Sequence, residues 1–476
     1  MSYIQIPFDA RLNPKFKERV LSLLRDNSPE ENVLSVCKSL SEENQKVYDS
    51  VDVSDVVHRL NMIESEIRKH LVNRRDITQQ GLRALMTSEH QFIFSAAGVA
   101  KSLYARQVFS FFKHSDIFSI QFSPDTSPDD LFGAYDIEKF KKGEIYHNVE
   151  GSIITNNFAF LDEFMDGSDK LLRSLLNVLL ERRFISGNQV EEALLHSAIA
   201  TSNYMRVSET TEALLDRFLY KSFITPSKDM FTLLRIDKVY NDNAGLVVEP
   251  NADILVEMRE LYVIKEIIRN KRSDFTIKIP IEMNYLKNLV VVAFEEEMKK
   301  YRDNYYISPR TITKSNDLMK ANALLDGRMV VDKTDVEQLY YLFCTLNEPL
   351  DSDRSLLSQT LFSQVFKKRY QYFESVKEQL IPLLYIFEFM VQAQRDPKML
   401  ENSIEFIDDL AKHSVISNLF DMLKHPFMSK NEHNGLLNKS HLLEFVKSIK
   451  SSYNEINQFR DRVEIYIKEV FALLES

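Results

Sequence analysis

The stretch Phe92-Ile-Phe-Ser-Ala-Ala-Gly-Val-Ala-Lys-Ser102 decides the fold class of the central part of this 476-residue chain. Its short apolar run breaks into small residues, and Lys101-Ser102 then opens an amphipathic helical pattern. This order predicts a buried strand, a loop of the size that holds a phosphate group, and a helix N-terminus whose N–H groups face the anion. The strict phosphate-loop pattern has glycine at the positions of Ser95 and Ala100, so an ordinary strand-to-helix turn would also explain the stretch.

Polar residues follow at the ends of two more apolar runs. Phe158–Leu161 predicts a buried strand, and Asp162 and Glu163 stand at its C-terminal end, where open α/β sheets bind ligands. In ATPases with a phosphate loop, one acid at this place completes the magnesium shell and a second residue orients the attacking water. The run Ala198–Asn203 predicts a third strand that ends in a polar residue, Asn203, whose amide is able to hydrogen-bond that water. A solvated acidic turn is the plainer reading of the two acids taken alone.

Two arginines extend this order of elements. Arg217 lies near the end of a helix predicted over Glu212–Phe218, and a salt bridge with Asp216 or with another acid of this helix is its simpler explanation. Ser308-Pro309-Arg310 predicts a helix start, because serine caps helices and proline suits their first position. Each element alone is uninformative, but five of them in this order are typical of a nucleotide site.

In order and spacing, the chain resembles the MoxR group of AAA+ ATPases, and within it the RavA-like branch, over roughly residues 57–345. The resemblance assigns the nucleotide-binding loop to Ser95, Ala96, Ala97, Gly98, Val99, Ala100, Lys101, Ser102 and Leu103. It assigns the Walker B acids to Asp162 and Glu163, sensor 1 to Asn203, the arginine finger to Arg217 and sensor 2 to Arg310. Leu179–Val190 is similar to the hairpin before sensor 1, at whose base we expect Arg182 and Arg183 to be solvated or interface charges.

The resemblance implies ATP and Mg²⁺ as the cofactors of an ATP hydrolase. Lys101 would bind the phosphates, and Ser102 and Asp162 would hold the metal ion. Glu163 would orient or deprotonate the attacking water, and Asn203 would fix the position of that water.

The resemblance also implies an assembly. Arg217 would act in trans on the site of a neighbouring subunit, whereas Arg310 would report from the lid on ATP held between the core and the lid. The family implies a homo-oligomeric, hexameric ring that remodels or chaperones a protein client, for which a von Willebrand factor A protein is the candidate.

The phosphate loop departs from the family pattern, which usually reads Gly-Pro-Pro-Gly-x-Ala-Lys-Ser. Ser95, Ala96 and Ala97 replace its first three residues. We expect the Cβ of Ser95 to constrain a turn that glycine would make freely, and the missing prolines to leave the loop more flexible. Weak nucleotide affinity or slow turnover would follow.

The predicted fold is an α/β P-loop AAA+ core with a five-stranded parallel sheet, an all-α lid, and helical N- and C-terminal regions. The expected boundaries are a helical extension over 1–56, the nucleotide-binding core over 57–228, the lid over 229–345 and a helical partner or assembly region over 346–476. Apolar residues step by three or four from Ile456 to Leu474, which fits either a helix packed in its own bundle or a docking helix.

Composition excludes several classes of protein. The net charge of −10, with interleaved signs, argues against broad nucleic-acid binding by phosphate neutralisation. Cys37 and Cys344 are too few and too far apart for a disulfide scaffold or a thiolate metal site, which fits a reducing cytoplasm. No secretory signal is evident, and the longest apolar run, Leu380–Val391, is too short to span a membrane because Pro382 and Glu388 interrupt it.

Two alternatives remain open beside the ring-forming ATPase. One is a nucleotide-gated scaffold that binds ATP but hydrolyses it slowly, which the altered residues Ser95–Ala97 favour; the retained Glu163, Asn203 and Arg217 favour the hydrolase. The other is a DNA motor, against which the acidic net charge and the lack of a basic-aromatic run argue. The sequence leaves the client and the subunit number undetermined.

Overall fold

The computed structural model describes residues 6–26, 28–141, 143–187, 189–204, 206, 209–224, 229–301, 305–343, 352–400 and 439–475. By its contacts the chain divides into two units. The sheet unit comprises Met1–Thr276, Ser308–Gly327 and Leu339–Ser358, and the helical unit comprises Ile277–Ile307, Arg328–Gln338 and Gln359–Ser476. The boundaries expected at 56, 228 and 345 remain predictions.

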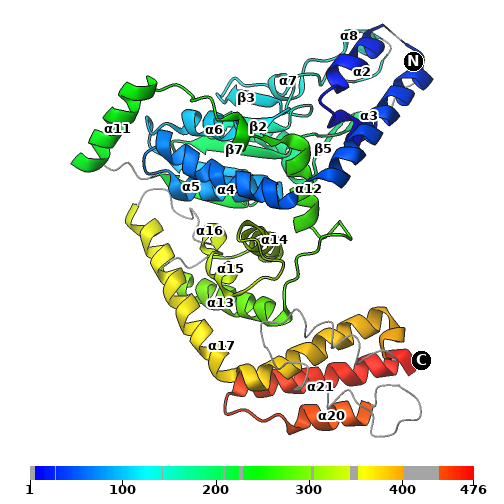
Figure 1. Cartoon of the computed structure of the whole chain (residues 1–476), viewed down its shortest axis with the longest axis vertical. Coiled ribbons are helices and arrows are strands. Elements are labelled where there is room, and N and C mark those ends of the chain that lie inside the picture. The colour runs from blue at the N-terminus through cyan, green and yellow to red at the C-terminus, as the bar shows by residue number, and fades with distance from the viewer. Residues whose placement is uncertain are drawn as a thin grey trace. The chain divides into compact units, whose positions relative to one another are not determined.

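A five-stranded sheet lies at the centre of the sheet unit (Figure 1). Its strands run in the order β3 (Ile117–Gln121), β4 (Phe158–Asp162), β7 (Ser197–Ser202), β1 (Gln91–Ser95) and β8 (Tyr220–Ile224). Every neighbouring pair is parallel, which confirms the predicted sheet. Because the strands are parallel and in step, their carboxyl ends meet at one edge.

The sheet unit contains two smaller strand pairs and most of the helices. The pairs are β2 (Phe112–Lys113) with β9 (Val256–Glu257), and the hairpin of β5 (Arg183–Ser186) and β6 (Gln189–Glu192). The helices are α1 (Phe8–Arg11), α2 (Phe16–Arg25), α3 (Glu30–Ser50), α4 (Val53–His70), α5 (Arg75–Thr87), α6 (Lys101–Phe109), α7 (Pro128–Phe132), α8 (Ile137–Lys141), η1 (Phe164–Asp166), α9 (Asp169–Glu181), α10 (Glu209–Leu215), α11 (Met230–Asn243), η2 (Ala252–Ile254), α12 (Met258–Ile268), α14 (Pro309–Leu325) and α16 (Tyr340–Phe343).

Both faces of the sheet are buried along β1, β4 and β7, as expected for parallel strands, whereas β3 at the sheet edge is partly exposed. Alternate strand residues such as Phe92 and Leu161 share one core cluster with helix α9. On the other face, Phe158 stacks on Phe109 of α6 with the ring centroids 4.7 Å apart. Helices therefore hold the sheet from both sides and fix the loops at its edges.

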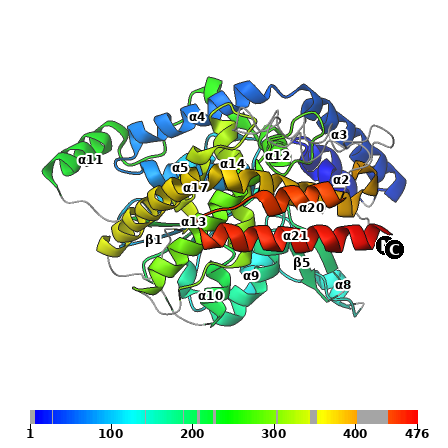
Figure 2. The same cartoon turned by 90° about the horizontal axis from the view of Figure 1, so that it is seen from below.

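Three N-terminal helices, α1 to α3, have a small apolar cluster of their own around Ala10, Val20 and Val33. Figure 2 shows α2 and α3 on the same side of the sheet unit as α8 and β5. The aromatic ring of Tyr48 in α3 stacks on that of Tyr262 in α12, with a centroid distance of 5.9 Å. Cys37 is buried in these helices, and Cys344 lies outside the described residues.

Arg182 corrects one expectation about the hairpin base. Its backbone is left-handed (φ 55°), and its guanidinium is buried, donating to the carbonyl oxygens of Ser88 (2.7 Å) and His196 (3.2 Å). Burial lowers its pKa to about 10. Arg182 thus connects the hairpin to the amino ends of the strands through hydrogen bonds. Arg183 is exposed, as expected.

The helical unit is built from α13 (Ile281–Lys299), α15 (Lys333–Glu337), α17 (Ser352–Arg395, mostly in this unit), η3 (Pro397–Leu400), α20 (Lys439–Ser448) and α21 (Asn454–Glu475). The apolar stripe of α21 packs inside this unit: Val463, Ile467 and Val470 are buried, and Phe459 lies against Tyr285 of α13. Packing within its own unit therefore accounts for the stripe. Among the described residues, no helix is both long and apolar enough to cross a membrane.

Lys265 of α12 gives the sheet unit a pH-dependent stability. Burial, together with the nearby Arg269 and Arg182, lowers the pKa of Lys265 to about 7. In the unfolded chain the pKa is about 10.4, so between these values only the unfolded state holds the proton. The free energy of unfolding should therefore rise with pH from 7 to 10, by at most about 1.4 kcal/mol per pH unit from this group.

Urea unfolding at pH 7 and pH 9 checks this expectation. Lys265→Met should flatten the rise, because methionine fills the same space without a proton to release. Lys46→Met is the matched control, since Lys46 is exposed on α3 and should leave the rise in place. An equal rise in wild type and Lys265→Met would contradict the assignment.

Candidate nucleotide site

The predicted phosphate loop connects β1 to α6 as expected, but its strain lies at another residue. Ser95 is the last residue of β1, is buried, and pairs with Ile224 of β8. Its backbone is not left-handed, so no glycine is needed there and the expected constraint from its Cβ is wrong. The left-handed residues are Gly98 (φ 78°) and Ala100 (φ 62°), of which only alanine carries a steric cost.

Lys101 opens α6 directly after this loop, and its side chain is buried at the edge of the sheet. Its Nζ donates to Oδ1 of Asn203. Burial lowers the pKa of Lys101, and the nearby Glu163 and Asp162 act in the opposite direction. A buried ammonium between two carboxylates is placed to neutralise a bound polyphosphate.

Asp162 is held in place from three sides. The Ser102 hydroxyl donates to its Oδ2 (3.3 Å), the Glu163 backbone N–H donates to its Oδ1 (3.1 Å), and the Thr201 hydroxyl also donates to Oδ1. The sequence analysis missed Thr201, although it lies at the carboxyl end of the same predicted strand as Asn203.

Glu163 and Asn203 face each other across the carboxyl ends of β4 and β7. The Asn203 amide nitrogen donates to Oε1 of Glu163 while its oxygen accepts from Lys101. Glu163 is itself left-handed (φ 48°), an uncommon conformation for a non-glycine residue that often marks functional positions. The three side chains thus form one hydrogen-bonded chain.

The donor set suits a magnesium ion held together with substrate phosphates. Mg²⁺ prefers oxygen ligands, and protein sites for nucleotide-bound Mg²⁺ commonly supply only one or two of them. The Ser102 hydroxyl and the Asp162 carboxylate are such a pair, in mutual contact. Within the described residues there is no cluster of three or more histidine, cysteine or acidic side chains that would suggest a different metal site.

The two predicted arginines lie at the opposite edge of the sheet. Arg310 of α14 contacts Asp216 (3.5 Å), whose carboxylate also accepts from Ser308 (2.9 Å). Asp216 and Arg217 lie a few residues before β8, which starts opposite Gln91 and ends opposite Ser95. The start and end of this strand are roughly 13 Å apart at the usual rise per residue.

Among the described residues, Arg217 does not form the expected salt bridge with Asp216. Asp216 pairs with Arg310, and Nη1 of Arg217 donates to the backbone carbonyl of Ala213. The Nε of Arg217 is buried and has no hydrogen-bond partner among the residues that the structure describes. The structure thus brings together Lys101, Ser102, Asp162, Glu163 and Asn203, and places Arg217 and Arg310 elsewhere.

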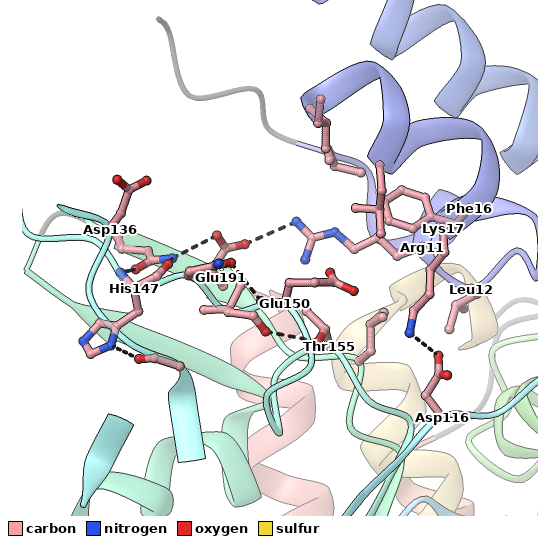
Figure 3. A pocket seen from close by; sticks show the side chains of 18 of the residues that line it. Arg11, Leu12, Phe16, Lys17, Asp116, Asp136, His147, Glu150, Thr155 and Glu191 are labelled. Atoms are coloured by element: carbon pink, nitrogen blue, oxygen red, sulfur yellow. Dashed lines mark hydrogen bonds and ion pairs between the residues drawn. The ribbon is translucent and has the colours of Figure 1, made fainter. Parts of the chain in front are cut away.

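A separate cavity of about 1230 Å³ lies between the N-terminal helices and the segment that leads to the hairpin (Figure 3). Two ion pairs cross it, Arg11 to Glu191 (3.2 Å) and Lys17 to Asp116 (3.0 Å). None of the residues of the predicted nucleotide site lines this cavity. It is thus distinct from the nucleotide site.

The left-handed Ala100 predicts opposite effects of two glycine substitutions in the loop. Ala100→Gly should stabilise the protein by about 1 kcal/mol, because a left-handed alanine costs about 1–2 kcal/mol and glycine adopts this conformation freely. Ala96→Gly, at a position without positive φ, should destabilise it by about 0.5 kcal/mol through added freedom of the unfolded chain. Chemical denaturation measures both, and effects of the same sign would contradict the backbone assignment.

Two segments of the chain match known protein families. Residues 58–241 match the family described as the MoxR domain in the MoxR-vWA-beta-propeller ternary systems. Residues 288–354 match the family described as an AAA lid domain.

Curated relatives and a solved structure agree with these matches. The protein MJ0079 of Methanocaldococcus jannaschii is 25% identical over 295 residues, covering 61% of this chain and 71% of the relative. The chaperone MoxR1 of Mycobacterium tuberculosis is 26% identical over 292 residues, covering 59% and 73%. The structural protein ORF618 of Acidianus two-tailed virus is 22% identical over 395 residues, covering 78% and 63%.

A crystal structure from Cytophaga hutchinsonii superimposes with a TM-score of 0.51 at 20% identity, covering 69% of this chain and 97% of that one, and it supports the fold alone. The RavA-like branch stays a prediction. The two matched segments and the MoxR chaperone relative, together with the five-stranded sheet, support a MoxR-type AAA+ ATPase.

Proposed function

We propose that the chain binds Mg²⁺–ATP at the carboxyl edge of its sheet, hydrolyses it in a ring of identical subunits, and uses the reaction to remodel a protein partner. The observation that carries this proposal is the contact network of Lys101, Ser102, Asp162, Glu163 and Asn203. Each has the chemical type that phosphoryl transfer to water requires at its position.

The hydrogen-bonded chain from Lys101 through Asn203 to Glu163 suggests how the site changes when nucleotide binds. Lys101 would exchange its bond with Asn203 for the phosphate oxygens, since an anion is the stronger acceptor. Asn203 would then be left to orient Glu163 and the attacking water. Magnesium supplies charge neutralisation on the phosphates, and Ser102 and Asp162 would hold it.

Assembly follows from the separation of the arginines from this network. With Arg217 and Arg310 at the amino edge of the sheet, each chain offers two arginines that its own phosphate loop does not use. A head-to-tail arrangement would bring them to the nucleotide of the next subunit, and a closed ring gives every site such a donor. We therefore place both arginines in trans, which differs from the initial expectation that Arg310 reports on the nucleotide of its own chain.

Helix α11 supports an interface on the sheet unit. It extends to the side of that unit (Figure 1) and leaves most of its apolar side chains in solvent. The exposed ones are Met230, Phe231, Leu233, Leu234, Ile236 and Tyr240. So much exposed apolar surface on one helix is typical of a contact with another protein.

A hexamer, a cytoplasmic location and a von Willebrand factor A client are parts of the proposal that rest on the family. The matched domain is described from MoxR-vWA-beta-propeller systems, which supports such a client. The nucleotide-gated scaffold remains the second candidate, favoured by Ser95, Ala96 and Ala97 in place of the family's Gly-Pro-Pro. A wild-type protein that binds ATP but does not hydrolyse it would favour the scaffold over the hydrolase.

Mixing two inactive variants tests whether Arg310 acts in trans. Glu163→Gln and Arg310→Ala should each lower ATP turnover by at least about 100-fold, by analogy with arginine fingers. Mixed one to one and allowed to exchange subunits, they should recover about a quarter of the wild-type rate, since one interface in four pairs an intact glutamate with an intact arginine. No recovery would place Arg310 in cis.

The same mixture with Arg217→Ala in place of Arg310→Ala should also recover about a quarter of the rate. Lys101→Ala mixed with Glu163→Gln is the matched control, because both residues belong to one site and no interface of that mixture is complete. Steady-state phosphate release measures all three mixtures. Recovery in the Lys101 mixture would contradict the assignment of Lys101 and Glu163 to one site.

A further inference from the structure

Arg74 contacts the phosphate loop from outside it. Its Nη2 donates to the backbone carbonyl of Val99 (2.9 Å), and its Nη1 donates to that of Asn73 (3.1 Å). Val99 lies between the left-handed residues Gly98 and Ala100. The contact therefore reaches the most sharply bent part of the loop, directly before the lysine of the nucleotide site.

The charge of this guanidinium has no carboxylate partner among its hydrogen bonds and ion pairs in the described part of the chain. Both of its acceptors are neutral carbonyl oxygens. Burial lowers the pKa of Arg74, and no nearby acid acts against that effect. A partly buried cation without a countercharge is costly, and an anion bound at the adjacent loop would reduce that cost.

The loop itself has little to fix its conformation. Ser95, Ala96 and Ala97 bring no proline, and Ala96 to Gly98 and Ala100 are exposed. Ordering such a loop around a ligand costs conformational entropy at each residue. A bond from a fixed neighbouring element to the middle of the loop lowers that cost, because the loop is then ordered before the ligand arrives.

We propose that Arg74 is a positioning residue that braces the phosphate loop of this chain through the Val99 carbonyl and thereby pre-orders it for the polyphosphate of a nucleotide. The inference rests on the proposed function. In it, Arg74 stiffens the phosphate loop in place of the two prolines of the family pattern. Its effect is on nucleotide affinity, since Arg74 contacts neither Glu163 nor Asn203.

The start of helix α5 depends on the backbone of Arg74 and not on its side chain. The start of α5 uses the backbone carbonyl of Arg74, which accepts from the backbone N–H (3.0 Å) and the hydroxyl (2.7 Å) of Thr78. A side-chain substitution leaves these bonds in place. The guanidinium is thus available for the loop without being needed to start the helix.

A double-mutant cycle on nucleotide binding tests the brace in the full-length protein. Arg74→Met should raise the dissociation constant of ATP and ADP about tenfold in the native loop and less than about threefold in a loop that carries Ala96→Pro and Ala97→Pro. Arg74→Lys, which keeps a cation and a donor, should stay within about threefold of wild type. In turnover assays Arg74→Met should raise KM and leave kcat unchanged.

Arg75→Met is the matched control, because the neighbouring Arg75 side chain is 63% exposed and should alter neither affinity nor KM. An equal loss of affinity in the native and the diproline loops would overturn the brace, as would no loss in either. If the folded wild type binds no nucleotide, the proposed function fails and the brace fails with it. Binding by wild type that Lys101→Ala abolishes and Arg74→Met leaves intact would overturn the brace alone.

Discussion

The parallel register of β1, β4 and β7 is the constraint on which the site depends. It brings the last residues of three strands to one edge, where Lys101, Glu163 and Asn203 form a single hydrogen-bonded chain. The length of β8 also separates this edge from Asp216, Arg217 and Arg310. The parallel register therefore brings most of a nucleotide site together at one edge, and we propose that the two arginines act on the site of another subunit.

The sequence predicted this edge because its signals are local. An apolar run followed by a polar residue predicts both a buried strand and the side chain at its carboxyl end, and parallel pairing then brings such ends together. The five-stranded sheet and the helical terminal regions follow from the same patterns. The same reasoning could have found Thr201, since it is a polar residue near the carboxyl end of a predicted strand.

Other features depend on contacts between distant parts of the chain, which no local pattern reveals. The sequence predicted backbone strain at Ser95, but the left-handed residue of the loop that carries a steric cost is Ala100. Arg182 appeared as a surface charge because its partners Ser88 and His196 come from other elements. The place of Arg310 required knowing that α14 packs beside Asp216 rather than over the phosphate loop.

The central claim is an ATPase whose sites are completed between subunits. ATP turnover per subunit, measured across a wide range of protein concentrations, tests it most directly. The account predicts that turnover per subunit is close to zero in dilute solution and rises as subunits associate, in step with the assembled fraction seen by light scattering. Turnover per subunit that is appreciable and constant down to the monomeric range would contradict it.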